Sequence, residues 1–131
     1  MPSATQTAPA SRISLWAGRI LSALPVLLFA FTGMFGLLKP DVAAQGAIRY
    51  GYAPGTLMHI TIVELACAAV YAIPRTSVLG AILMTGYLGG ATATHVRVGE
   101  PPLLPIIVGV VVWAGLFLRE ERLRRLIPLR R

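Results

Sequence analysis

Charged residues are scarce in this sequence, and that scarcity narrows the class of protein. Asp, Glu, Lys and Arg together make up 13% of the chain, whereas 56% of it is hydrophobic; a soluble globular domain usually carries about 25% charged residues. A disordered chain is excluded, because disorder depends on low hydrophobicity and high charge. A water-soluble domain with a single core is excluded too, because too few polar side chains remain to cover its surface. We therefore expect the 131-residue chain to reside in a lipid bilayer.

Acidic residues and cysteine are scarcer still. Five Asp and Glu residues stand against twelve Lys and Arg residues, which leaves a net charge of +7. The basic residues lie between apolar runs and accumulate only at the C-terminus. No aromatic pattern accompanies them, so we expect anionic lipid rather than nucleic acid as their partner. The single cysteine, Cys67, cannot form an intramolecular disulfide, and the sequence has neither a C-x-x-C pair nor a nucleotide-binding glycine loop.

Long apolar runs fill most of the remaining sequence. The clearest, from Ile20 to Leu38, has nineteen residues without a charge; as a helix it would extend about 28 Å, close to the thickness of a hydrocarbon core. We predict an all-α fold, an integral membrane four-helix bundle over residues 15–118. The predicted spans are 15–38, 56–73, 77–95 and 102–118. The remaining segments are a disordered leader (1–14), a long loop (39–55) and a basic cytoplasmic tail (119–131).

The distribution of basic residues predicts the orientation of these spans. Four spans place both termini on the same side of the membrane, and basic residues concentrate on the cytoplasmic side. Nine basic residues fall on the side of the termini and three on the other. The nine are Arg12, Arg19, Arg75, Arg119, Arg122, Arg124, Arg125, Arg130 and Arg131, and the three are Lys39, Arg49 and Arg97. We expect a multi-pass protein of the bacterial inner membrane with both termini in the cytoplasm.

Glu64 is the most informative polar residue, because it falls in the middle of the second span. It lies eight residues after Thr56, or about 12 Å below the outer surface. An ionisable group is costly at that depth and faces the bundle interior or a wet cavity. Thr61 and Tyr71 are expected on the same stripe of the helix. One interpretation is a carboxylate that handles protons or binds a ligand; the other is a protonated hydrogen-bond staple between helices.

Two histidines, His59 and His95, are expected at the outer end of the bundle, where the second span enters the membrane and the third span leaves it. Imidazole suits proton exchange with a quinone head group, so a quinone site is one interpretation. The other is a pair of interfacial histidines that bond to the loop backbone. No metal site is expected, because the pair lacks a tight ligand spacing such as H-x-x-x-H.

Small residues are dense in the third span. Gly86 and Gly90 form a G-x-x-x-G pattern, and Gly89 belongs to a parallel row of small residues. Such patterns let helix backbones approach closely in lipid. We therefore predict that these glycines pack helices together and that the third span is the most enclosed helix. Their packing partner is either another span or a second copy of the chain.

The block from Gly86 to Pro101, with Glu64 before it, resembles the DoxX-like family of small four-helix bacterial membrane proteins. The similarity extends from about Ile20 to Arg125. It implies a four-helix bundle in the inner membrane and redox work near the quinone pool, so the expected cofactor is a quinone, or none. The family's motif positions fall in this sequence on Glu64, Tyr87, His95 and Arg97.

These observations predict an auxiliary protein or a subunit of a membrane redox system, with a polar intramembrane pocket. Its candidate ligand-binding residues are His59, Glu64, Tyr87, His95 and Arg97. The alternative is an enzyme or enzyme subunit in which Glu64 and His95 handle protons on a quinone or another lipophilic substrate. A small transporter is disfavoured, because four spans without an inverted repeat make a poor alternating-access machine. Expected partners are the bilayer and either a membrane oxidoreductase complex or a second copy of the chain.

Overall fold

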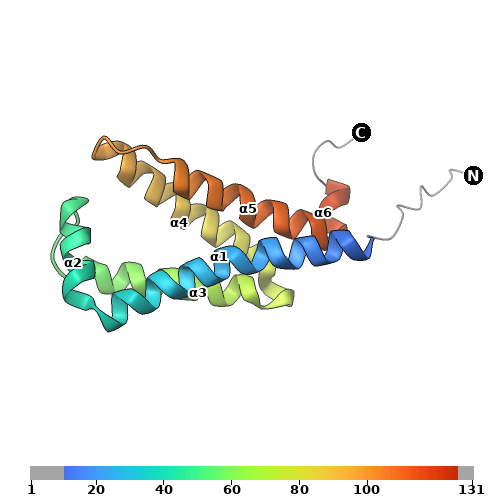
Figure 1. Cartoon of the computed structure of the whole chain (residues 1–131), viewed down its shortest axis with the longest axis horizontal. Helices are drawn as coiled ribbons and strands as arrows, with labels where there is room; N and C mark the ends of the chain where they lie inside the picture. Colours follow the sequence, from blue (N-terminus) through green and yellow to red (C-terminus); the bar gives the residue numbers. More distant parts are fainter. Residues whose placement is uncertain (1–10, 127–131) are drawn as a thin grey trace, which may run out of the picture.

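Every regular element in the described part of the chain is helical. The structure, a computed structural model, describes residues 11–126. The elements are α1 (Arg12–Leu38), α2 (Pro40–Arg49), α3 (Thr56–Ala72), the short 3-10 helix η1 (Pro74–Thr76), α4 (Ser77–Arg97), α5 (Leu103–Arg119) and α6 (Glu121–Leu126) (Figure 1). The prediction of an all-α fold is confirmed over these residues.

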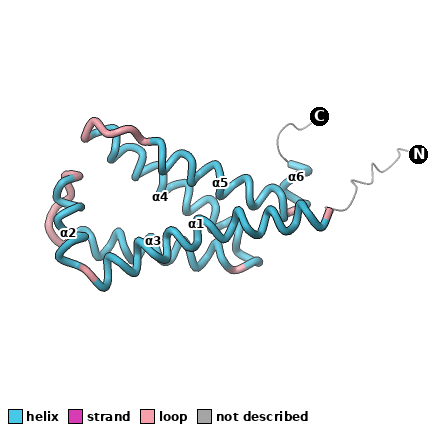
Figure 2. The backbone as a smooth tube through the Cα atoms, in the orientation of Figure 1, coloured by secondary structure: helices cyan, strands magenta, loops and turns pink. Residues whose placement is uncertain are grey.

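The four longest helices, α1, α3, α4 and α5, run along the long axis of the molecule (Figure 1). Helix α1 packs against α3 and α5, and α4 packs against the same two helices. The connecting loops gather toward the two ends of the molecule (Figure 2). The start of α1 and helix α6 share one end, which we call the terminal end, and α2 crosses the other, which we call the α2 end.

Glycines set the closest approaches between these helices. A Cβ atom at Gly80 would overlap the backbone of Tyr71, so α4 reaches the end of α3 only because that position has no side chain. A Cβ atom at Gly115 would lie 2.7 Å from the hydroxyl oxygen of Ser22. A contact this short forces neighbouring atoms to shift, which destabilises a packed core. The two glycines therefore allow the α3–α4 and α1–α5 contacts.

The glycines that the sequence singled out have no such role within the chain. A Cβ atom at Gly86, Gly89 or Gly90 would meet no atom within 4 Å, so these glycines do not pack the spans of one chain together; packing against a second copy of the chain stays a prediction. The prediction that the third span is the most enclosed is wrong, because the apolar windows of α1 and of η1–α4 are equally buried, at 28%. A G-x-x-x-G pattern lets another helix approach closely, but it does not determine which helix lies opposite. Here Gly86 and Gly90 border one open groove and Gly89 borders another.

The ends of the chain differ from the prediction. Residues 12–14, assigned to the leader, form the first turn of α1, because the Ser11 hydroxyl oxygen accepts a hydrogen bond from the Ser14 amide at 3.1 Å and caps the helix. The rest of the predicted leader, residues 1–10, lies outside the described residues. The predicted tail, 119–131, is helical at Glu121–Leu126, and residues 127–131 lie outside the described part.

The predicted loop at 39–55 contains a helix, α2. Pro40 occupies its first position, where no amide donor is needed, and Asp41 and Arg49 place opposite charges at the two ends of the helix dipole. These local signals outweigh the weak apolar pattern of the segment. The predicted spans 56–73, 77–95 and 102–118 lie within two residues of α3, α4 and α5.

Two helical stretches, Arg12–Leu38 and Pro74–Arg97, are long and apolar enough to cross a membrane. Helix α1 has 27 residues and extends about 40 Å, whereas α3 and α5 have 17 residues each and extend about 25 Å. Large apolar side chains stay exposed on all four long helices, among them Phe31, Ile62, Ile82 and Val110. An apolar exterior of this extent is typical of a protein embedded in lipid.

Candidate functional site

A cavity of about 390 Å³ lies between α1, α3, α4 and α5, beneath α2. We call it the central cavity. Apolar side chains such as Phe29 and Val108 form much of its wall. Polar side chains from several elements also reach this wall; they are Thr32, Tyr50, Thr61, Glu64, Tyr87 and His95. The cavity thus brings together three of the predicted site residues, Glu64, Tyr87 and His95.

Glu64 on α3 supplies a carboxyl group to this wall and is only 8% exposed. Its Oε1 atom accepts a hydrogen bond from the hydroxyl group of Thr32 on α1. The phenol of Tyr87 on α4 interacts with the same carboxyl group. The Tyr87 ring is itself positioned by Phe29, with 5.1 Å between the two ring centroids. Side chains of three helices therefore meet at one buried carboxyl group.

The hydroxyl group of Thr32 accommodates Glu64 in either protonation state. Besides its contact with Glu64, Thr32 Oγ1 lies 2.9 Å from the carbonyl oxygen of Leu28. A hydroxyl group has one proton to donate and two lone pairs that accept. Thr32 donates to Glu64 when the carboxyl group is ionised; when it is protonated, Glu64 donates to Thr32, which then donates to Leu28. Glu64 can gain or lose a proton without leaving a buried polar group unpaired.

His95 is held in a defined orientation on the same wall. Its Nδ1 atom lies 2.8 Å from the carbonyl oxygen of Ala91. Because a carbonyl oxygen only accepts, Nδ1 carries the proton in this contact. The imidazole also packs against the ring of Tyr50, with 5.3 Å between the ring centroids. In the neutral imidazole, Nε2 is then the nitrogen that can accept a hydrogen bond from a ligand.

A second cavity, of about 400 Å³, forms a groove between α3 and α4. We call it the α3–α4 groove. His59 lines this groove rather than the central cavity, so the structure separates it from Glu64. Gly86 and Gly90 line the groove as well. The groove adjoins the central cavity, because the two share the residues Ile60, Tyr87, Ala91 and His95.

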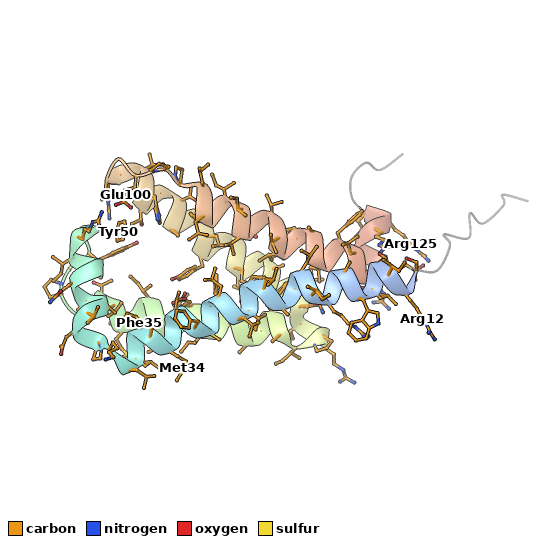
Figure 3. The ribbon with its side chains drawn as sticks, in the orientation of Figure 1. Arg12, Met34, Phe35, Tyr50, Glu100 and Arg125 are labelled. Atoms are coloured by element: carbon orange, nitrogen blue, oxygen red, sulfur yellow. The ribbon has the colours of Figure 1, made fainter. Side chains whose placement is uncertain are left out.

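Polar contacts fasten the α2 end above the central cavity. Arg49 Nη2 donates to Glu100 Oε1 at 2.6 Å, and the Tyr50 hydroxyl donates to Glu100 Oε2 at 2.8 Å (Figure 3). Arg97 Nη2 donates to the carbonyl oxygen of Tyr50 at 2.6 Å. These contacts, which we call the α2 clasp, tie the end of α2 to the end of α4 and the loop after it. The hydrogen bond to Glu100, followed by burial, raises the pKa of Tyr50 above its usual value.

Two polar residues predicted near Glu64 lie elsewhere. Arg97 belongs to the α2 clasp and stacks on Tyr52, with 5.7 Å from its guanidinium carbon to the ring centroid. Tyr71 was expected on the Glu64 stripe, but its hydroxyl group donates to the carbonyl oxygen of Val112 at 2.8 Å, nearer the terminal end. Within residues 11–126, no three His, Cys, Asp or Glu side chains are grouped so that they could hold a metal ion.

Sequence reasoning missed Thr32 and Tyr50 as site residues. Thr32 lies in the first span, and the pattern within one helix does not tell which residue of another helix it meets. Its sequence signal is a polar side chain in the middle of an apolar run. Tyr50 was assigned to a loop, so its position at the end of α2, above the cavity, was not anticipated.

A family model described as the DoxX-like family matches residues 20–115, about three quarters of the chain. The matched range includes every residue that lines the central cavity and the α3–α4 groove. No curated protein and no solved structure gives a significant match.

Proposed function

Because the chain belongs to the DoxX-like family, we propose that it is a ligand-binding subunit of a membrane redox system. Helices α1, α3, α4 and α5 each span the bacterial inner membrane in this proposal, and both termini lie in the cytoplasm. The central cavity holds the head group of a quinone, or of a lipophilic molecule with the same hydrogen-bonding groups.

The apolar exterior supports four spans, including the two short helices. On α3, Ile62 and Val63 are 56% and 50% exposed, and on α5, Ile106 and Val110 are 48% and 64% exposed. Side chains of this kind are stable on the outside of a helix when lipid covers them. A helix of 17 residues is also at the lower limit of about 17–25 residues for a membrane span.

Charge at the two ends supports the orientation. The described basic residues of the terminal end are Arg12, Arg19, Arg75, Arg119, Arg122, Arg124 and Arg125. Those of the α2 end are Lys39, Arg49 and Arg97. Basic residues concentrate on the cytoplasmic side of membrane proteins, so the terminal end is assigned to the cytoplasm.

One observation carries the ligand-binding proposal: the buried Glu64 carboxyl group borders an empty volume. A structural staple between helices needs a partner but no cavity, whereas small-molecule sites typically occupy roughly 300–1,000 Å³. The central cavity, at about 390 Å³, falls in that range and has mostly apolar walls with a few convergent polar groups. A quinone presents two carbonyl oxygens that need donors. The Tyr87 phenol and a protonated Glu64 can each donate to one of them, in place of their present contacts with each other and with Thr32.

A bound quinone supplies two-electron chemistry, and its reduction to the quinol takes up two protons. Glu64 would hold one of these protons at the cavity wall, where Thr32 is its hydrogen-bond partner, and bulk water would supply the other. Tyr87 and His95 orient the head group through their fixed rings. The chain has one cysteine, so it cannot supply the electron pair from a dithiol, and a partner oxidoreductase subunit provides it. The protein therefore acts as a subunit rather than as a complete enzyme.

The α3–α4 groove gives such a ligand a route from the lipid. The α2 clasp fastens the outer end of the molecule, whereas Gly86 and Gly90 leave open space along the side of α4. The groove adjoins the central cavity at Tyr87 and His95. A hydrocarbon tail lies in the groove while the head group occupies the cavity.

The test is quinone binding by the purified full-length chain in lipid nanodiscs. A short-chain benzoquinone is titrated into wild type, Glu64→Leu and Glu64→Gln, with Glu120→Gln as a control for a carboxyl group outside the central cavity. We expect Glu64→Leu to lower the affinity by about tenfold, because one charge-assisted or neutral hydrogen bond of roughly 1.5 kcal/mol is lost. Glu64→Gln keeps a hydrogen-bond donor, so its affinity for the quinone should be within a few-fold of the wild-type affinity.

Two outcomes would overturn this proposal. A wild-type protein that carries no quinone after extraction and binds none on titration is not a quinone-binding subunit. Equal binding by wild type and Glu64→Leu places the ligand outside the central cavity. If Glu64→Leu is also less stable than wild type to heat, Glu64 is a structural staple between α1 and α3.

A further inference from the structure

A third cavity lies at the terminal end, far along the helices from the central cavity, and it contains two arginines. It is a groove of about 320 Å³ beside α1 and the end of α3. Arg19 of α1 and Arg119 of α5 both line it. Much of the remaining wall is apolar and consists of Ala23, Val26, Leu27 and Ala72. We call it the arginine groove.

Close packing of α5 on α1 brings Arg119 into this groove. A Cβ atom at Gly18 would lie 2.9 Å from the carbonyl oxygen of Gly115 and 3.0 Å from the Cβ atom of Arg119. A side chain at position 18 would therefore push the end of α5 away from α1. The guanidinium carbon of Arg119 lies 5.5 Å from the ring centroid of Tyr71, so a cation–π contact holds it above α3.

Arg119 also contains a donor that lacks a partner. Its Nε atom is the one buried side-chain nitrogen or oxygen in residues 11–126 without a hydrogen bond. Neither Arg19 nor Arg119 forms an ion pair in the described part of the chain, whereas Arg49 and Arg125 each pair with a glutamate. Buried donors are normally satisfied, and an exception is explained by strain or by an acceptor such as water or an anion. The groove therefore presents two positive charges without a negative partner.

We propose that the arginine groove binds the phosphate of an anionic phospholipid. A guanidinium group bonds to phosphate oxygens through charge-assisted and often bidentate hydrogen bonds. The two arginines lie at the end of the spans, where lipid head groups are found. From there the apolar wall continues along α1 to Leu27, whose side chain is 64% exposed. An acyl chain of the bound lipid packs against this wall. A soluble phosphate ion has no apolar part that could contact this wall, whereas a phospholipid has both a phosphate and acyl chains. The lipid therefore fits the groove better.

The test is lipid binding by the full-length chain in detergent, followed by native mass spectrometry. Phosphatidylglycerol is compared with phosphatidylcholine carrying the same acyl chains, and inorganic phosphate is added as a competitor. The variants are Arg19→Gln and Arg119→Gln, and the matched control is Arg122→Gln, an exposed residue of α6 at the same end. We expect wild type to prefer phosphatidylglycerol and each groove variant to weaken that binding about fivefold, with no change in the control.

The outcomes that contradict the proposal are distinct. If wild type binds the two lipids equally, the groove is not specific for an anionic lipid. If Arg122→Gln weakens phosphatidylglycerol binding as much as the groove variants do, the preference comes from the net charge of the protein and not from the groove. Displacement of the lipid by millimolar inorganic phosphate assigns the groove to a soluble anion. Arg119 is a packed side chain, so Arg119→Gln could prevent folding. Arg19 is exposed, and Arg19→Gln then still tests the proposal.

Discussion

At the scale of single residues, Glu64 depends on a hydroxyl group that lies 32 positions away in the sequence, on Thr32. Thr32→Val keeps the shape of that side chain but removes its hydroxyl group. We expect this variant to lose about 1–3 kcal/mol in the free energy of unfolding, because the buried carboxyl group loses a donor. Thermal unfolding in detergent measures the loss.

The control for that prediction removes the carboxyl group as well. Thr32→Val combined with Glu64→Leu leaves an apolar pair, so most of the stability should return. If the double variant is as unstable as Thr32→Val alone, the hydroxyl group acts through its bond to the Leu28 carbonyl oxygen and not through Glu64.

Tyr50 gives the α2 clasp a dependence on alkaline pH. Its hydrogen bond to Glu100, followed by burial, raises the pKa of the phenol in the folded protein above the usual 10.0. The contribution of the neutral phenol to stability is therefore complete below about pH 10 and is lost as the pH rises through the folded-state pKa. We expect Tyr50→Phe to unfold more easily than wild type near pH 8, with a difference that shrinks above about pH 11. Unfolding midpoints of both proteins across this range provide the check, and a difference that does not vary with pH contradicts it.

Part of the site could be predicted from the sequence because an ionisable group in an apolar span is costly whatever surrounds it. This reasoning located Glu64 without knowledge of its partners. The role of Arg97 could not be predicted in the same way, since it depends on the carbonyl oxygen of Tyr50, 47 positions away. Thr32 was missed for the same physical reason, because contacts between helices are not encoded in the periodicity of either helix.

At the scale of helices, the ends of the apolar spans were predictable and the contacts between them were not. Helices α3 and α4 begin at Thr56 and Ser77, the residues where the predicted spans begin. Helix α2 was missed because its signals are Pro40 at the start and charges at both ends, not an apolar run. The contacts of the glycines in α4 could not be predicted for a related reason. Their spacing shows where another helix can approach closely, but not which helix lies opposite.

Two glycine substitutions in α4 distinguish a position that contacts another helix from one that only leaves room for such a contact. Gly80→Ala places a methyl group against the backbone of Tyr71, so we expect a destabilisation on the order of 1–3 kcal/mol. Gly90→Ala places the same group in open space and should cost nothing, since alanine is the better helix former. Thermal unfolding of both variants in detergent is the measurement. Equal losses in the two would indicate that a second copy of the chain packs on Gly90.

At the scale of the whole molecule, the two ends are expected to face different compartments. A reporter fused after the C-terminus should be active only in the cytoplasm, because the terminal end carries most of the basic residues. The same reporter inserted in the turn at Ala53–Gly55, at the α2 end, should be active only on the outer side. A C-terminal fusion that is active outside would reverse the orientation and place the arginine groove in the outer leaflet.

The unequal lengths of neighbouring helices have a consequence for the surrounding bilayer. Helix α1 extends about 40 Å, while its neighbours α3 and α5 extend about 25 Å each. The apolar run of α1, from Ile20 to Leu38, extends about 28 Å, so all of these apolar lengths fall short of a hydrocarbon core of about 30 Å. In the proposed four-span arrangement we therefore expect the leaflets to thin around the bundle, most of all beside α3 and α5. The bilayer deformation costs fractions of a kcal/mol per ångström of mismatch. The protein should therefore partition into thin, fluid regions of the membrane in preference to thick, ordered ones.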